Sequence, residues 1–407
     1  MNAADTAWML VSTALVLSMT PMLAFFYGGL VRSKNALNTM MMSFISLGFI
    51  GLTWAVIGYS LSFADGSDYL GGTQWLFLKG VALEPKAGTT IPHYLFMCYQ
   101  GTFAIITAAL ISGAIVERMR FSAYVLFITL WSVVVYAPMA HWVWGGGWLA
   151  KMGALDFAGG TVVHINAAAA ALVAALLVGK RRDFKTQALM PHNVPFVLLG
   201  AGLLWMGWFG FNAGSALSAG NSAAIAFTAT MLAPAGTLVV WTLLDAVRQG
   251  KPTAVGAATA IVVGLVAITP AAGYVGPMSA LALGGIAAVP SYFVILWRAK
   301  TNLDDSLDVV AAHGVGGTVG ALLTGVFANE QLNGIAGASG LLFGKASQLG
   351  TQAVAVLAAI AFSAVASFIL LKVVGMVFPL RASDEGEREG MDVSMHGEEA
   401  YVHSSGN

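Results

Sequence analysis

The 407-residue chain is poor in charge, because only 9% of its residues are Asp, Glu, Lys or Arg, against roughly 25% in soluble domains. Its formal net charge is zero, so the composition gives no indication of nucleic-acid binding. The single cysteine, Cys98, lies in an apolar segment, which excludes an intrachain disulfide and a cysteine-based metal site. The first ten residues lack the basic region of a signal peptide. Neither the composition nor the cysteine count indicates a metal or a cofactor, and we expect none.

Apolar residues are abundant instead. They make up 58% of the chain and recur in runs of about 20 residues. Each run is long enough to cross a bilayer core of about 30 Å as a helix, and the 48 glycines suit close helix packing in a membrane. The sequence predicts an all-α polytopic membrane protein with eleven transmembrane helices, at 7–31, 40–64, 92–116, 121–143, 157–179, 193–215, 221–247, 253–270, 277–297, 309–328 and 347–379.

Basic residues in the connections predict the orientation. If the N-terminus is outside, fifteen Lys and Arg residues fall on the inner side, and only Lys79, Lys86, Lys151 and Lys345 fall on the outer side. Cytoplasmic loops carry the excess of Lys and Arg, so we expect the N-terminus outside and the C-terminus in the cytoplasm. Residues 1–380 are then the transmembrane domain. The polar, acidic segment 381–407 cannot span and is expected to be a cytoplasmic tail.

Two segments of the chain resemble each other. The fifth span begins DFAGGTVVHINAAAAALV, and the tenth begins DVVAAHGVGGTVGALLTG; both combine an aspartate, one histidine and a GGTV string. Spans 1–5 and 6–10 would be two halves with five helices each. An odd number of helices forces opposite orientations, which is the inverted repeat common in transporters. The long eleventh helix would stand outside this repeat.

His164 and His313 lie inside these two matching spans. In an inverted pair the two rings approach each other from opposite faces. Ionisable residues within spans usually face the protein interior and mark a pathway, so we expect a hydrogen-bonded pair lining a narrow pore. The alternative is that each ring fills a polar gap between helices. His141 has no such counterpart, and we assign it a structural role.

Several residues are expected at the outer mouth. Trp144 ends span 4, Phe211 and Ser215 end span 6, and Tyr99 and Phe103 lie in the outer half of span 3. Aromatic faces attract cations by about 0.5–2 kcal/mol, and a serine hydroxyl accepts hydrogen bonds from a donor-bearing ion. The alternatives are an interfacial aromatic belt for Trp144 and plain core packing for Phe103 and Phe211.

Charged residues near the span ends have simpler expected roles. Asp156 and Asp308 each precede a span, where a carboxylate accepts free N–H groups and suits the helix dipole. Glu117, Arg118 and Arg120 stand in VERMRFS, which we interpret as a solvated inner connection.

Longer strings of this sequence resemble the Amt/MEP/Rh ammonium transporter family, in particular its bacterial AmtB-like branch. The resemblance runs from the first span to the tail, in FYGGLVRSKN (26–35), ERMRFSA (117–123), HWVWGGGWLAKMGALDFAGGTVVHINAA (141–168), GWFGFNAGSA (207–216), HGVGGTVGALLTGVFA (313–328) and EREGMDVSMHGEEAY (387–401). It implies a homotrimer in the bacterial cytoplasmic (inner) membrane, with one substrate path through each subunit.

The resemblance also implies roles for individual residues. Trp144, Phe103, Ser215 and Tyr99 correspond to the outer site that recruits ammonium, although Tyr99 stands where well-known members carry phenylalanine. Phe103 and Phe211 correspond to the stacked gate, and Asp156 to an aspartate that supports the site. His164 and His313 correspond to the twin histidines of the pore and proton relay.

The implied function is ammonium transport rather than an enzymatic reaction. The chain would recruit ammonium or methylammonium, remove a proton and conduct ammonia, with net charge movement. The tail resembles the segment that engages a PII-type nitrogen-signalling protein; a solvated acidic tail is the alternative. The competing functions are an Rh-like neutral gas channel, an ammonium sensor or receptor, and an intramembrane enzyme, which the absence of an H-E-x-x-H motif disfavours.

Overall fold

The computed structural model describes residues 1–401, and all regular structure within them is helical. Residues 402–407, the end of the expected cytoplasmic tail, lie outside the described residues. Within 1–401, ten helical segments are long and apolar enough to cross a membrane, and the shorter apolar helix α11 (Ala254–Ile268) is the eleventh. The predicted fold class is confirmed, and the predicted spans match these segments to within a few residues, except at the start of the second and the end of the fourth.

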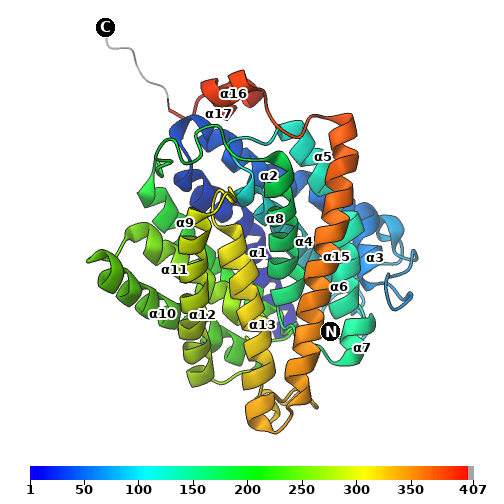
Figure 1. Ribbon diagram of the computed structural model, residues 1–407. Coiled ribbons are helices and arrows are strands. Elements are labelled where there is room, and N and C mark those ends of the chain that lie inside the picture. Colours follow the sequence, from blue (N-terminus) through cyan, green and yellow to red (C-terminus); the bar gives the residue numbers. More distant parts are fainter. Residues whose placement is uncertain (402–407) are drawn as a thin grey trace.

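The spans contain the following helices: α1 (Ala3–Leu30), α2 (Ala36–Thr53) continued by α3 (Tyr59–Phe63), α4 (His93–Ile111), α5 (Phe121–Trp131) continued by α6 (Ala137–Val143) and α7 (Trp148–Met152), α8 (Asn166–Val178), α9 (Val194–Gly214), α10 (Asn221–Gln249), α12 (Pro277–Lys300), α13 (Gly316–Phe327) and α15 (Ser347–Val377). Three short helices, α14 (Glu330–Asn333), α16 (Asp384–Glu389) and α17 (Met391–His396), lie outside the spans. Figure 1 shows α16 and α17 at one end of the helical bundle.

The first helices of the two predicted halves, α1 and α9, pack along each other. Glycine permits this close approach, because a Cβ at Gly200 would lie 2.5 Å from the backbone nitrogen of Phe26. Small residues let helix backbones meet in this way where the hydrophobic effect does not drive helices together. The pairing brings the two halves into contact along their leading helices.

The two histidine-bearing segments begin in the same way. Gly160–Ile165 and Val310–Val315 form π-helical turns that lead into α8 and α13. Asp156 precedes His164 by eight residues, and Asp305 precedes His313 by eight. The Asp305 carboxylate accepts hydrogen bonds from the backbone N–H groups of Val309 (3.1 Å) and Val310 (2.7 Å). This matching arrangement agrees with the predicted inverted repeat.

The expectation that Asp308 caps the tenth span was therefore wrong. Asp308 has a left-handed backbone conformation, with φ of 59°, and its carboxylate accepts from Arg298 Nε at 2.5 Å. Asp305 performs the capping role instead. The physical reason is that the free N–H groups at the helix start belong to Val309 and Val310, and the carboxylate that reaches them stands four and five residues earlier in the chain.

The connection between α4 and α5 also differs from the prediction. Glu117 is 2% exposed and Arg118 fully buried, so these two residues are not solvated, whereas Arg120 is exposed as expected. Glu117 pairs with Arg181 at 2.7 Å and with Arg32 at 3.0 Å. The Arg118 guanidinium donates to several backbone carbonyls. Charged side chains tolerate burial only when they are paired in this way.

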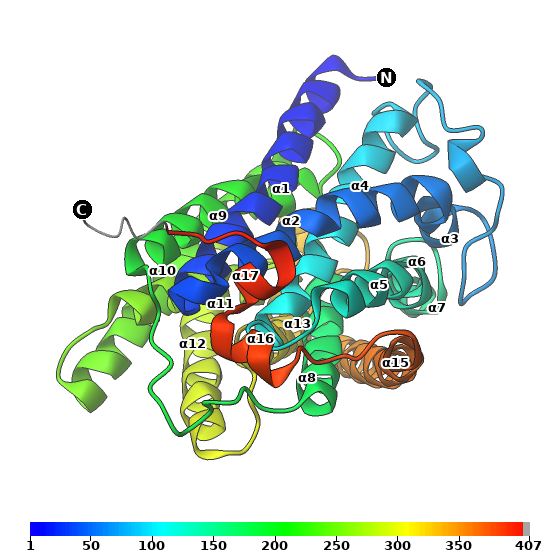
Figure 2. The same ribbon diagram turned by 90° about the horizontal axis from the view of Figure 1, so that it is seen from above.

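The tail folds back onto the body of the protein, as Figure 2 shows for α16 and α17. The Asp392 carboxylate accepts from the backbone N–H groups of Leu37 (3.0 Å) and Asn38 (2.7 Å) at the start of α2. At the opposite end of α1, the backbone N–H of Asn2 donates to the Thr90 carbonyl in the loop between the second and third spans. The described part of the tail thus contacts the start of α2, and the N-terminal end of the chain contacts the loop between the second and third spans.

Candidate functional site

A pocket of about 380 Å³ opens beside the loop between the second and third spans. Trp144, Phe103 and Ser215 line it, together with Phe157 and Gln100. The indole N–H of Trp144 donates to the Asp156 carbonyl at 2.9 Å, which fixes the ring. The rings of Phe103 and Trp144 meet edge to face, with 5.8 Å between centroids. We call this cavity the outer pocket.

Tyr99 lies behind the outer pocket rather than in its lining. It is fully buried, and its ring packs against the ring of Phe103 at 5.0 Å. Its hydroxyl is within hydrogen-bond distance of the Phe211 carbonyl (2.9 Å) and of Ser215 Oγ (3.2 Å). The hydroxyl therefore ties the third span to the C-terminal end of α9.

Phe103 and Phe211 close the floor of the outer pocket. Their ring centroids are 4.2 Å apart, with 32° between the ring planes. Phe103 lines the outer pocket, and Phe211 lines the cavity next to it. The two rings consequently separate one cavity from the other.

His164 and His313 form a buried pair directly below this floor. Their Nδ1 atoms are 3.2 Å apart, so one ring can donate and the other accept, depending on the tautomers. The His164 ring also faces Trp208, with 5.5 Å between centroids. Both histidines line a cavity of about 20 Å³ whose other walls are apolar or aromatic, formed by Met19, Leu23, Phe26, Ile106, Leu110, Val163, Leu204, Trp208, Phe211 and Val262. That volume is close to the space that one water-sized molecule needs.

Asp156 stabilises the backbone at the start of the fifth span. Its carboxylate accepts from the N–H groups of Gly159 (2.8 Å), Gly160 (2.6 Å) and Thr161 (2.8 Å), and from the Thr161 hydroxyl. The carboxylate oxygens are thus occupied by the helix start, while the backbone carbonyl holds Trp144. Asp156 positions both the pocket wall and the helix that carries His164.

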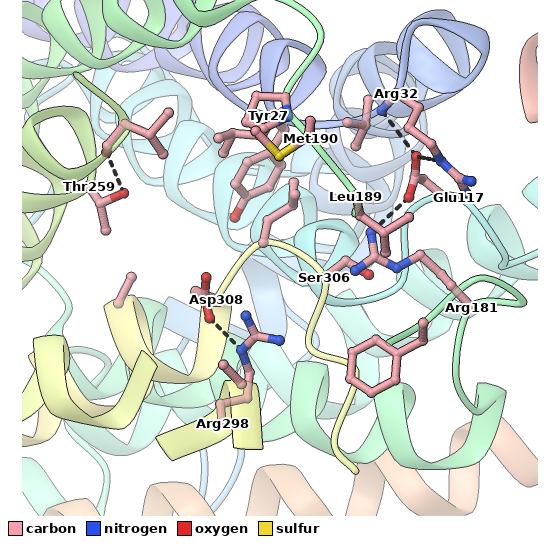
Figure 3. A pocket seen from close by; sticks show the side chains of 18 of the residues that line it. Tyr27, Arg32, Glu117, Arg181, Leu189, Met190, Thr259, Arg298, Ser306 and Asp308 are labelled. Carbon is pink, nitrogen blue, oxygen red and sulfur yellow. Dashed lines mark hydrogen bonds and ion pairs between the residues drawn. The ribbon is translucent and has the colours of Figure 1, made fainter. Parts of the chain in front are cut away.

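A second pocket, of about 350 Å³, reaches His313 from the opposite side. Figure 3 shows its charged wall, in which Glu117 joins Arg32 and Arg181, and Arg298 joins Asp308. We call it the inner pocket. Burial alone would raise the pKa of Glu117, but the charges of Arg181 and Arg32 lower it to about 2. Burial and the neighbouring Asp308 carboxylate raise the pKa of Asp305.

Two residues that lie beside the His164–His313 pair, Trp208 and Thr269, were not predicted from the sequence. Trp208 stands three residues before Phe211, on the same face of α9, and this spacing was a usable signal. The Thr269 hydroxyl accepts from the Trp208 indole at 2.9 Å and lies 3.4 Å from His164 Nε2. Nothing in the sequence around Thr269 distinguishes it from other threonines at helix ends. His141 is buried between the carbonyls of Ser62 and Ser67, in agreement with its structural assignment.

The fold and these cavities define a class of protein. Two pockets at opposite ends of a helical membrane bundle meet at a constriction with paired rings and paired histidines, which is the arrangement of a membrane transport protein. Within residues 1–401 no group of three or more His, Cys, Asp or Glu side chains is placed to hold a metal ion.

Comparisons with known proteins give the family. Residues 7–401 match the model of the Ammonium Transporter Family. The chain is 48% identical to an ammonium transporter of Bacillus subtilis (strain 168), covering 99% of this chain and 100% of the relative. It is 50% identical to an ammonium transporter of Aquifex aeolicus (strain VF5), covering 98% and 94%. The chain belongs to the ammonium transporter family, whose members are transport proteins and not enzymes.

Solved structures share this fold. The crystal structure of Candida albicans Mep2 superimposes with a TM-score of 0.89 at 37% identity, covering 94% of this chain and 87% of that chain. A structure described as a Sensor Amt Protein gives a TM-score of 0.89 at 29% identity, covering 97% and 98%. The chain is a multi-pass membrane protein of this family.

Proposed function

We propose that this protein recruits ammonium in the outer pocket and passes it as ammonia along the buried histidine pair. The observation that carries the proposal is that the outer pocket, the Phe103–Phe211 floor, the His164–His313 cavity and the inner pocket adjoin one another in that order. Trp144 and Phe103 offer aromatic faces to a cation, and Ser215 Oγ accepts one of its N–H groups. Tyr99 orients Ser215 from behind, and Asp156 holds Trp144 in place.

The ability to lose a proton distinguishes ammonium from metal cations and provides the selectivity of the path. Phe103 and Phe211 form a gate, beyond which the cavity is narrow and mostly apolar. Burial disfavours the charged form of an amine, so ammonium continues as neutral ammonia. Potassium and sodium have no proton to lose and keep the full desolvation penalty of a charge. The apolar constriction thus supplies a discrimination that cation–π attraction alone does not.

The histidine pair gives the released proton a route. A neutral imidazole has one acceptor and one donor nitrogen, and the 3.2 Å contact between His164 and His313 links the two rings. The pair accepts the proton on the side of the outer pocket and releases it towards the inner pocket, which His313 lines. Ammonia and proton then cross together, and transport moves net charge.

The remaining proposals concern assembly and location. The protein acts as a homotrimer in a bacterial cytoplasmic (inner) membrane, with its N-terminus outside and its C-terminus in the cytoplasm. Residues 1–380 form the transport domain, and 381–407 form a regulatory tail that a PII-type signalling protein engages. The docking of Asp392 on α2 supports a regulatory role, because it connects the tail to a span of the transport domain.

The test is current and uptake on purified protein in proteoliposomes. An ammonium pulse is expected to give an inward current, together with saturable uptake of labelled methylammonium. Flux without current would make the protein a neutral gas channel of the Rh type. Binding without flux would make it a sensor, a function favoured only by its structural similarity to the Sensor Amt Protein.

A further inference from the structure

Lys86 places a positively charged side chain in the lining of the outer pocket. It belongs to the loop between the second and third spans, is partly buried and lines the same pocket as Phe103, Trp144 and Ser215. Its Nζ lies 4.7 Å from the centre of the Phe96 ring and 6.0 Å from that of Trp75. Phe96 also lines the outer pocket. The lysine is therefore held on aromatic faces at the entrance of the proposed path.

The chemical group on Lys86 matches the expected substrate. Its ε-ammonium is an alkylammonium, like methylammonium, and both are attracted to aromatic faces in the same manner. Burial lowers the pKa of Lys86, and the charge of Asp65 opposes that change. Lys79, in the same loop, is exposed and is not among the residues that line the outer pocket. Of these two lysines in the loop, Lys86 therefore contributes its charge to the outer pocket, and Lys79 does not line it.

We propose that Lys86 sets the affinity of the outer pocket by repelling the incoming cation. A fixed positive charge in the mouth lowers the local concentration of ammonium and raises the KM. Its position above the Phe103–Phe211 floor leaves the later steps unaffected. This inference rests on the proposed recruitment of ammonium in the outer pocket.

The experiment compares KM and maximal rate for labelled methylammonium in proteoliposomes. Lys86→Gln and Lys86→Met remove the charge, and each is expected to lower the KM about three- to tenfold with little change in maximal rate. The difference is expected at an ionic strength of about 0.01 M and should shrink at about 1 M, where the Debye length falls to roughly 3 Å. Two uncharged variants keep the test valid if one of them fails to fold.

Two controls separate charge from packing. Lys86→Arg keeps the charge and should keep the parental KM, and Lys79→Gln makes the same change to the charge of the loop and should have no effect. An unchanged or higher KM in the uncharged Lys86 variants would overturn the inference, as would the same decrease in Lys86→Arg or Lys79→Gln. If Trp144→Ala weakens uptake while Lys86→Gln equals the parent, only this inference fails. If the parent shows no saturable uptake, the proposed function itself fails.

Discussion

His164 and His313, which are 149 residues apart in the chain, bring their Nδ1 atoms to 3.2 Å. Each ring follows a buried aspartate by eight residues and sits in a π-helical turn. The two carboxylates bind the backbone at the start of these turns, so each histidine is held by its own segment. The contact between the rings joins the two halves of the protein at the small cavity that both rings line.

Replacing either histidine should impair transport without unfolding the protein. In His164→Ala or His313→Ala one ring loses its partner and the proton route is broken, so we expect methylammonium uptake to fall about tenfold or more, or potassium to compete better. Uptake and ammonium-evoked current in proteoliposomes measure both effects. Elution of the detergent-solubilised variant at the parental volume is the control for folding. Parental uptake and selectivity in both variants would contradict the relay.

The two aspartates near the tenth span should differ in their effect on stability. Asp305→Ala leaves the N–H groups of Val309 and Val310 without their acceptor, and we expect a loss of about 1–2 kcal/mol. Asp308→Asn removes a partly exposed ion pair with Arg298 and keeps a residue that tolerates the left-handed conformation, so its effect should be about 0–1 kcal/mol. Thermal unfolding in detergent gives both values. A greater loss in Asp308→Asn would show that the capping assignment is wrong.

The buried Glu117 network should weaken in acid. The pKa of Glu117 lies near 2, below its ordinary 4.5, so its stabilising contribution is present above pH 4.5 and disappears as the pH falls towards 2. Glu117→Gln leaves Arg181 and Arg32 without their shared counter-charge, and we expect about 3–5 kcal/mol of destabilisation at pH 7. The melting temperature of the variant should depend less on pH between 5 and 3 than that of the parent. Parallel pH profiles would argue against the pairing.

The tail should open when its anchor on α2 is removed. Asp392→Ala takes away the acceptor for two backbone N–H groups, worth about 1–2 kcal/mol. Trypsin cleavage after Arg388, an exposed residue of α16, should accelerate about five- to thirtyfold. Glu385→Ala, an exposed change in the same short helix, should cleave at the parental rate. Equal rates for all three proteins would mean that Asp392 does not hold the tail.

Hydropathy by itself predicts the helical architecture of this protein. A run of about 20 apolar residues has few stable alternatives to a membrane helix, so the eleven spans were predictable one by one, even where α11 is short. The matching positions of His164 and His313 followed from the repeat, since an inverted pair of segments brings corresponding residues together. The segment 141–168, which contains Trp144 and Asp156, could likewise be recognised from the sequence by its resemblance to the family.

The partners of the polar groups were decided only by the tertiary structure. Whether Asp305 or Asp308 caps a helix depends on one left-handed residue, and whether Glu117 is solvated depends on arginines 64 and 85 residues away. The hydroxyl of Tyr99 and the ammonium of Lys86 likewise find partners on other elements. Local sequence sets the period and hydropathy of one helix, whereas the pairing of buried charges is set by contacts between helices that lie far apart in the chain.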